Sequence, residues 1–394
     1  MSKENSVVIV AAKRTPMGGM QGDFATVTAP ELGSVAIKAA LEQSGLSADA
    51  IDEVYFGSVV SAGLKQAPAR QASLGAGLML ATPTTTISKV CGSGMKAVMI
   101  GRDQIVAGNA DVIMAGGMES MSLTPYLVPK ARTGLKFGHG EIKDSLLLDG
   151  LEDAASGGPM GAFGQSIADR FNVSRETMDE FALRTLSRAK TAINEGWMKN
   201  EIAGVTVKTR KGDVLIEQDE QPGKAMPEKI PQLKPAFKKD GTVTAANSSS
   251  MSDGAAAVLL MRESTAEEKG CKPIARLVAQ SSHAQAPEEF CLAPIGAIKK
   301  LLDKSGWTLD DVDLFEINEA FAVVAILAIQ ELGLDAEKVN VHGGACALGH
   351  PLGASGARII VTLINALQRL GKKRGIATLC IGGGEATAVA IELM

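Results

Sequence analysis

The segment LEQSGLSADAIDEVYFG, residues 41–57, has a second copy in LDKSGWTLDDVDLFEIN, residues 302–318. When the two are aligned from their first residues, Leu, Ser, Gly and two Asp coincide, and Ser47 faces Thr308. Each copy predicts an amphipathic helix that ends near Ser-Gly, a short polar turn, and then a strand. The chain therefore carries the same helix–turn–strand unit twice.

A second pair of matching segments follows in the same order. CGSGMKAV at 91–98 and GASGARII at 353–360 each predict the start of a helix, and a glycine of one aligns with a glycine of the other. Each helix is followed by an apolar strand that ends in glycine, DVIMAGG at 111–117 and IATLCIGGG at 376–384. Two pairs in the same order favour an internal duplication over chance.

Both halves alternate apolar, β-branched strands with helices, which predicts an α/β protein with a mostly parallel sheet covered on both faces. Residues 120–250 have no counterpart in the C-terminal half and are richer in Lys, Glu, Gly and Pro. This stretch contains a strongly amphipathic helix from about Ser174 to Glu195. We interpret it as a large insertion in the first half, forming a substrate-binding lobe.

Near Ser252 the sequence SDGAAAVLLM predicts a return to a buried strand of the first half. The predicted domain organisation follows from that return. It comprises an N-terminal half at 1–121 and 252–270, an inserted loop domain at 122–251, and a C-terminal half at 271–394.

Composition argues against several classes of function. A net charge of −4 gives no basic footprint for nucleic acid, and no apolar run reaches the roughly 18 residues needed to span a bilayer. The N-terminus shows neither a signal-peptide core nor an Arg-rich transit peptide. The cysteines are odd in number, far apart and without metal-ligand spacing. We therefore expect a cytoplasmic protein that binds no metal, nucleic acid or membrane.

Four segments place a reactive side chain at the end of a predicted element. Cys91 lies in VCGSG at a strand-to-helix turn, where the helix N-terminus favours thiolate, although a free Cys is more often buried and inert. His350 lies in the glycine-rich turn ALGHPLGASG, either as a base or as a residue that only hydrogen-bonds the turn. The sequence alone leaves both alternatives open.

Two further polar sites interrupt apolar strands. Cys380 ends a strand before three glycines, whose N–H groups can converge on an oxyanion; the alternative is a core Cys before a flexible turn. Asn318 follows a strand in EINEAFA, at the edge where open α/β sheets place ligands, or it caps a helix with Glu319 in the first turn. If the halves pack around a pseudo-twofold axis, two thiols and one imidazole meet, which favours nucleophilic catalysis with proton transfer.

Seven motifs spread over the whole chain resemble those of the thiolases in order and spacing. They are VCGSGMKAV, AGGMESMS, KPAFKKDGTVTAANSS, SDGAAA, NEAFA, GGACALGHPLGASGAR and CIGGGEATA. The resemblance implies two duplicated α/β halves packed as αβαβα layers with a large inserted loop domain. It also implies coenzyme A thioesters as substrates, no cofactor, and a homo-oligomer that is a dimer or a tetramer.

The resemblance also implies a role for each reactive residue. Cys91 would attack an acyl-CoA and hold the acyl group, and His350 would take the proton of that thiol and later help to bind the second thioester oxygen. Cys380 would remove the α-proton of the incoming acetyl-CoA, while Asn318 would hold a water at the same oxyanion site. The backbone N–H groups of Cys91 and Gly382 would form a second oxyanion site.

Coenzyme A contacts are implied in the same way at Ser249, Met160, Ala320 and Phe321. This chain departs from the family pattern at three points. Pro159 stands where many biosynthetic members have His, Ala246 replaces a glycine, and the arginine often found near position 222 is missing, which leaves Lys224 as its substitute.

The implied reaction is the reversible condensation of two acetyl-CoA molecules to acetoacetyl-CoA and CoA, supported by the short-chain appearance of FGHGEIKDSLLLDGLEDA. One alternative is a 3-ketoacyl-CoA thiolase of fatty-acid β-oxidation with a preference for longer chains, and Pro159 points that way. A second is a non-catalytic thiolase-like lipid carrier. A ketoacyl synthase is less consistent with Cys380, since those enzymes typically use His/His or His/Asn in place of a second Cys.

Overall fold

The structure is a computed structural model of the chain, and it describes residues 6–394. Strands from both halves form one mixed sheet system in the order β12-β13-β14-β11-β1-β10-β5-β3-β4, with β2 beside β10. Its strands are β1 (Val7–Arg14), β2 (Gly18–Gly19), β3 (Glu53–Gly57), β4 (Thr84–Ile87), β5 (Val112–Ser120), β10 (Ser252–Arg262), β11 (Ala275–Ala284), β12 (Leu314–Ile317), β13 (Arg374–Ile381) and β14 (Glu385–Leu393).

The two halves repeat one strand order. The first half runs β1-β10-β5-β3-β4 and the second runs β11-β14-β13-β12, and the two meet where β1 pairs with β11 over two residues of each strand. A parallel bridge between Phe315 of β12 and Val339 takes the place that β4 has beside β3. The duplication predicted from the sequence is therefore confirmed.

The helix–turn–strand unit that defined the repeat has the predicted structure in both copies. Helix α1 (Ala29–Ser44) ends at Gly45 and α8 (Ala293–Ser305) ends at Gly306, and both glycines have φ of 71°. This left-handed conformation is easily accessible only to glycine, so the Ser-Gly pair ends each helix. A single 3₁₀ turn then leads into β3 or β12.

The expectation of a mostly parallel sheet is wrong. Among the named strands of residues 6–394, the parallel pairs are β3 with β4, β3 with β5, and β12 with β13, whereas β1, β10, β11 and β14 pair antiparallel to their neighbours. The reason lies in the connections. Strand β14 follows β13 after the three glycines at 382–384, and so short a turn can only reverse the chain direction.

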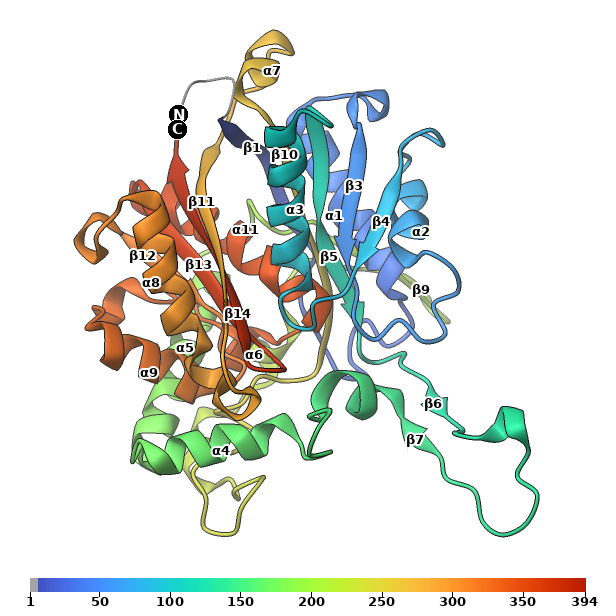
Figure 1. The fold of residues 1–394 in the computed structure, drawn as a ribbon, viewed down its shortest axis with the longest axis vertical. Coiled ribbons are helices and arrows are strands. Elements are labelled where there is room, and N and C mark those ends of the chain that lie inside the picture. The colour runs from blue at the N-terminus through green and yellow to red at the C-terminus, as the bar shows by residue number, and fades with distance from the viewer. Residues whose placement is uncertain (1–5) are drawn as a thin grey trace.

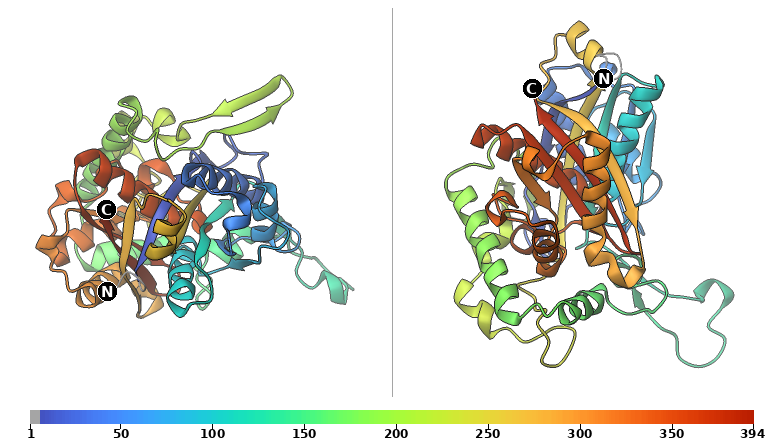
Figure 2. Two further views of the ribbon diagram at one scale, coloured as in Figure 1. Left: turned by 90° about the horizontal axis from the view of Figure 1, so that it is seen from above. Right: turned by 60° about the vertical axis from the view of Figure 1, so that its left-hand side comes forward.

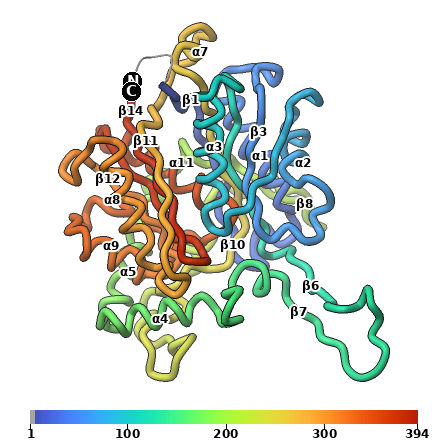
Figure 3. Tube along the Cα trace, viewed as in Figure 1, coloured from blue at the N-terminus to red at the C-terminus, as the bar shows by residue number. Residues whose placement is uncertain are grey.

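Three apolar cores hold five layers together, because the middle core surrounds the central helices and contacts the strands on both sides of them. This confirms the αβαβα arrangement (Figures 1 and 3). Helices α1 and α2 (Pro68–Gly75) cover the outer face of the first half, and α8 and α9 (Ala322–Leu332) cover that of the second. The middle core contains α3 (Ser93–Ala107) and α11 (Leu352–Leu370), packed between strands of both halves.

The stretch between β5 and β10 contains the remaining elements apart from α7 (Glu263–Glu268) and α10 (Ala345–Leu348). They are β6 (Tyr126–Leu127), β7 (Lys143–Asp144), α4 (Met160–Arg170), α5 (Arg175–Asn194), β8 (Val205–Thr209), β9 (Gly212–Ile216) and α6 (Glu220–Lys224). The helix predicted from Ser174 to Glu195 is α5, with Ser174 as its N-cap and Glu195 as its C-cap. The domain boundaries themselves stay a prediction.

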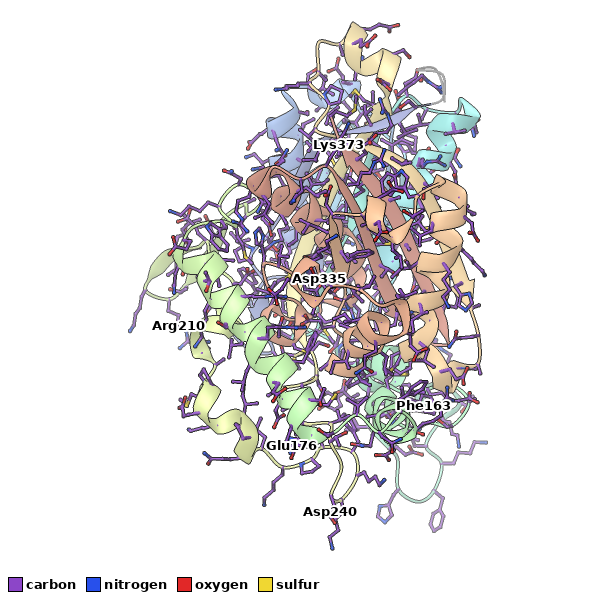
Figure 4. The ribbon with its side chains drawn as sticks, turned by 90° about the vertical axis from the view of Figure 1, so that its left-hand side faces the viewer. Phe163, Glu176, Arg210, Asp240, Asp335 and Lys373 are labelled. Carbon is purple, nitrogen blue, oxygen red and sulfur yellow. The ribbon has the colours of Figure 1, made fainter. Side chains whose placement is uncertain are left out.

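Two hairpin arms of this inserted stretch leave the body of the molecule (Figure 2). One contains β6 and β7, and the other is formed by β8 and β9. In Figure 4, Arg210 at the tip of the second arm lies at the left margin of the molecule, and Asp240, in the segment before β10, lies at its lower margin. Helix α5 instead packs back onto the second half through the core that contains Met178 and Phe181.

A contact between glycines brings the N-termini of α3 and α11 together on the sheet. A Cβ on Gly117 of β5 would lie 1.9 Å from the carbonyl oxygen of Gly353, and one on Gly94 would lie 2.9 Å from the same oxygen. A Cβ on Gly57 of β3 would also lie 2.7 Å from it. The start of α11 therefore rests on a surface that only glycines can provide.

We expect Gly117→Ala to lower the free energy of unfolding by about 3 kcal/mol, because the new methyl group must push α11 away from β5. The midpoint of urea unfolding measures this loss. Gly223→Ala is the matched control, since its Cβ would meet no atom within 4 Å, and we expect a change within about 0.5 kcal/mol. Equal midpoints for the two variants would contradict the close contact.

Candidate active site

Cys91 lies in a tight turn just before α3. Val90 has φ of 44°, a strained conformation for a β-branched residue, and Gly92 is the N-cap of the helix. Ser93 stabilises the turn, because its hydroxyl donates to the Val90 carbonyl and accepts from the Lys89 N–H. The strained turn sets the half-buried Cys91 side chain at the start of the helix.

The glycine run after Cys380 packs directly against this turn. A Cβ on Gly92 would lie 2.3 Å from the Ile381 side chain, so the two loops are in contact. The backbone N–H of Gly382 hydrogen-bonds the Cys91 sulfur. Cys380 is fully buried at the end of β13, close enough to Cys91 for the two thiolate charges to repel each other. The structure thus brings Cys91, Cys380 and Gly382 into one site.

The pKa of Cys91 is shifted in the direction opposite to our expectation, and that of Cys380 is shifted in the same direction as that of Cys91. Burial raises the pKa of Cys91 to about 11, although the N–H groups of Gly382 and Cys91 itself act to lower it. Burial also raises the pKa of Cys380 well above its usual value, and charge repulsion from Cys291 and Cys91 adds to this shift. Desolvation outweighs the helix N-terminus, so both side chains are thiols near neutral pH in the free protein.

His350 and Asn318 form the second part of the site, both of them buried. Asn318 Nδ2 lies 3.5 Å from His350 Nε2, and His350 Nδ1 lies 2.5 Å from the Ser355 hydroxyl. Burial, with a smaller contribution from the Arg358 charge, lowers the pKa of His350 to about 3. The imidazole is therefore neutral and has a lone pair with which to accept a proton.

Asn318 is no helix cap. Strand β12 ends at Ile317, and α9 begins only at Ala322 with Phe321 as its N-cap. The alternative interpretation of Asn318 and Glu319 as the first turn of a helix is therefore wrong. The Asn318 side chain instead lies between His350 and Arg358, at the carboxyl end of β12, where a ligand site was expected.

The two parts of the site are joined through the start of α11. Leu352, two residues after His350, packs in a small apolar cluster against which Cys91 also packs. The Glu119 carboxylate accepts the N–H groups of Gly353, Val59 and Val60, and its charge acts on Cys91. Cys91 and His350 thus precede two helices whose N-termini meet.

Three of the residues expected to contact coenzyme A form one cluster. Ser249 donates both its backbone N–H and its hydroxyl to the carbonyl of Ala320, each at 3.0 Å. The neighbouring Phe321 ring stands edge-on to Phe237 and Phe290, with centroids 6.2 Å apart in each pair. This cluster continues directly from Asn318 along the chain.

Met160 and Lys224 lie on different sides of the site. A Cβ added to Gly382 would lie 3.9 Å from the sulfur of Met160, so Met160 borders the glycine loop beside Cys91. Lys224 is exposed and paired with Glu220, and it lines a cavity of about 290 Å³ together with Ser250 and Cys346. The Ser250 carbonyl accepts the His350 N–H, so the cavity extends to the histidine loop.

Sequence reasoning missed four residues that support the site. Ser355 and Arg358 were within a quoted motif, and their spacing of three placed both on one face of the helix that follows His350. Glu119 was a lone acidic residue in an apolar strand, which signals a buried carboxylate with partners. Cys291, whose charge acts on Cys380, gave no local signal because it comes from a distant turn.

Within residues 6–394, no three His, Cys, Asp or Glu side chains are grouped so that they could hold a metal ion. No helix in the same part of the chain combines the length and apolar character needed to cross a bilayer.

Comparison with known proteins identifies one family along the chain. The model of the thiolase N-terminal domain matches residues 7–264, and that of the thiolase C-terminal domain matches residues 271–393. The acetyl-CoA acetyltransferase of Pseudomonas aeruginosa is 48% identical over 98% of each chain. Acetyl-CoA acetyltransferase A, mitochondrial, of Xenopus laevis is 47% identical over 98% of this chain and 92% of its own. The crystal structure of the Bacillus anthracis acetyl-CoA acetyltransferase matches with a TM-score of 0.96 at 41% identity, covering 99% of both chains.

The raised pKa of Cys91 has a direct kinetic consequence. Below its pKa of about 11 the thiolate fraction rises tenfold per pH unit, so we expect alkylation of Cys91 by iodoacetamide to accelerate without levelling between pH 7 and 10. Mass spectrometry of the Cys91 peptide gives the rate, with glutathione alkylated in parallel as a solvated thiol. A rate that levels off at or below pH 8 would mean that the protein stabilises the thiolate.

Proposed function

Because the chain belongs to the thiolase family, we propose that it is an acetyl-CoA C-acetyltransferase that reversibly condenses two acetyl-CoA molecules to acetoacetyl-CoA and CoA. One observation carries the proposal. Two thiols, Cys91 and Cys380, lie close together beside the Gly382 N–H, and the neutral imidazole of His350 precedes the helix packed against the Cys91 helix. That set supplies one nucleophile, one α-carbon base and one proton carrier.

The first half-reaction loads Cys91. His350 Nε2 takes the proton of the Cys91 thiol as the sulfur attacks the thioester carbonyl of acetyl-CoA, and the N–H groups of Cys91 and Gly382 bind the oxyanion. The C–S bond to CoA then breaks. The leaving CoA thiolate takes the proton of Cys380, which leaves an acetyl-Cys91 thioester, a Cys380 thiolate and a His350 imidazolium.

The second half-reaction forms the carbon–carbon bond. The Cys380 thiolate removes an α-proton from the second acetyl-CoA, while the imidazolium N–H of His350 and a water held by Asn318 stabilise the enolate oxygen. The α-carbon attacks the acetyl carbonyl, and the Cys91 sulfur leaves. It recovers its proton from His350, so every group returns to its starting state.

The raised thiol pKa values suit this division of work. A solvated thiolate would attack adventitious electrophiles, whereas Cys91 becomes nucleophilic only when a bound thioester is in place and His350 accepts its proton. The Cys380 thiolate, formed in an apolar surrounding, is a strong base for a weakly acidic α-carbon. The imidazolium formed in the same step offsets part of its charge.

We propose further that the pantetheine of CoA passes Ser249 and the Ala320–Phe321 segment and that the nucleotide lies at the cavity beside Lys224.

We also propose a homo-oligomer, because β4 is the terminal strand of the sheet and the β6–β7 arm exposes Tyr126 and Phe137. The free cysteines suit a reducing cytoplasm.

The role of each thiol is tested by substitution. We expect Cys91→Ala to lower thiolysis and condensation by at least about 10⁴-fold, because the nucleophile is gone. Cys380→Ser should still form an acetyl adduct on Cys91 but fail to form the carbon–carbon bond. Mass spectrometry after mixing with acetyl-CoA locates the adduct, and Cys271→Ala, a cysteine outside the site, serves as the matched control.

An adduct on any residue other than Cys91 would contradict these roles. A protein that bound acetyl-CoA and formed no adduct at all would be a lipid carrier rather than an enzyme.

Chain length separates the proposal from a longer-chain 3-ketoacyl-CoA thiolase. Met160 borders the glycine loop beside Cys91, and the Phe237 ring, which packs edge-on against Phe321, lies directly against the neighbouring Gly161. These bulky side chains near Cys91 favour a short acyl group. We therefore expect kcat/KM for thiolysis to be highest with acetoacetyl-CoA and to fall with each added two-carbon unit. A value that rises toward eight or more carbons would favour the β-oxidation enzyme.

A further inference from the structure

A buried arginine contacts the end of the Asn318 side chain that faces away from His350. Arg358 lies on α11 and is 1% exposed. Its Nη2 lies 3.3 Å from Asn318 Oδ1, and its Nη1 lies 3.5 Å from Glu316 Oε2, a carboxylate that is 2% exposed. Glu316 belongs to β12, so Arg358 ties the helix to the strand that Asn318 follows.

The chemistry of Arg358 determines which way the Asn318 amide points. A guanidinium has five N–H donors and no acceptor, so it can pair only with the oxygen of the amide. The Nδ2 group must then face His350, and its N–H can only be donated. His350 Nε2 is therefore the acceptor and carries no proton.

The hydrogen bonds on the Nδ1 side of the His350 ring also favour a proton on Nδ1 and none on Nε2. The Ser355 hydroxyl donates to the Pro351 carbonyl, at 2.8 Å, and a carbonyl can only accept. Ser355 Oγ is then free to accept the proton on His350 Nδ1, at 2.5 Å. An obligate donor at one end and an obligate acceptor at the other thus fix a single tautomer of the imidazole.

We propose that Arg358, held by Glu316, is a positioning residue that orients the Asn318 amide and thereby keeps His350 Nε2 unprotonated, so that this nitrogen can take the Cys91 proton. The inference rests on the proposed function for its catalytic meaning, but the tautomer is a property of the free protein. Arg358 acts on the proton transfer indirectly, through its contact with Asn318 and the contact of Asn318 with His350.

Neighbouring charges restrain the arginine further. Arg14, also fully buried, pairs with Glu201 at 2.5 Å and with Asp219 at 2.7 Å, and the charges of Arg14 and Glu201 act on both Arg358 and Glu316. In so crowded a set of buried charges, each guanidinium has few alternative orientations that keep its partners. These charges therefore help to hold the Arg358 guanidinium where it meets the Asn318 side-chain oxygen.

The ¹⁵N spectrum of histidine-labelled free protein tests the proposal, because a protonated and an unprotonated ring nitrogen have well-separated chemical shifts. The chain has only four histidines, and His350→Gln identifies the signals of His350 by their loss. We expect the wild-type protein to show a protonated Nδ1 and a bare Nε2. In Arg358→Met the amide is free to turn its oxygen toward the ring, and the Ser355 hydroxyl can rotate from the Pro351 carbonyl to donate to Nδ1. We therefore expect the proton to move to Nε2.

We expect kcat of Arg358→Met to fall about 10- to 100-fold through this misorientation, with little change in KM. Arg358→Lys keeps a donor-only side chain, so it should keep the wild-type tautomer and recover most of kcat. Arg369→Met makes the same exchange at the far end of α11 and should leave the His350 signals unchanged. Should the single variant fail to fold, Arg358→Met with Glu316→Gln removes both buried charges and gives the same readout.

A wild-type His350 that carries its proton on Nε2, or a tautomer unchanged in Arg358→Met, would overturn the proposal. Both results are independent of activity. A protein that shows the expected tautomer but does not cleave acetoacetyl-CoA would instead refute the proposed function and leave the positioning role intact.

Discussion

The site depends on one steric constraint, the close approach of two helix N-termini at the carbonyl oxygen of Gly353. Side chains larger than hydrogen at Gly117, Gly94 or Gly57 would occupy the space of that oxygen. Because Cys91 and His350 each precede one of these helices by two residues, the glycine contact governs how far apart these two residues lie. The remaining chemistry follows from that separation.

Burial sets the resting protonation state of Cys91, Cys380 and His350. It raises the pKa of both thiols and lowers that of His350, so the free site holds no charge on these three side chains at neutral pH. In the proposed reaction, charge appears on them only when substrate is bound and a proton moves within the site. Fixed N–H groups, such as that of Gly382, are already oriented to meet it.

The inserted stretch is attached to this core by buried charges as well as by apolar packing. Arg14 ends β1, and its guanidinium bonds Glu201 and Asp219, both from the insertion. Asp219 also accepts the N–H of Met17. Such a triad is stabilising only while every member keeps its partners, so the walls of the cavity beside Lys224 are held in a fixed relation to the sheet.

Periodicity and turn chemistry were enough to find the repeat, the helix from Ser174 and the strand ends that carry Cys380 and Asn318, because these features depend on neighbours in sequence. Strand direction was predicted wrongly, since the sheet pairs residues that are far apart and the glycines at 382–384 reverse the chain without a helix.

Local sequence therefore determined which residue types stand at each strand end, and the family motifs indicated which of them to propose as reactive. Only the tertiary structure decided their chemical state. The pKa of Cys91 depends on how completely distant segments exclude water, and the proton position on His350 depends on the donors and acceptors that Arg358 and Pro351 present to its partners. Solvation and hydrogen-bond direction are set by contacts across the whole fold, and a linear pattern does not contain them.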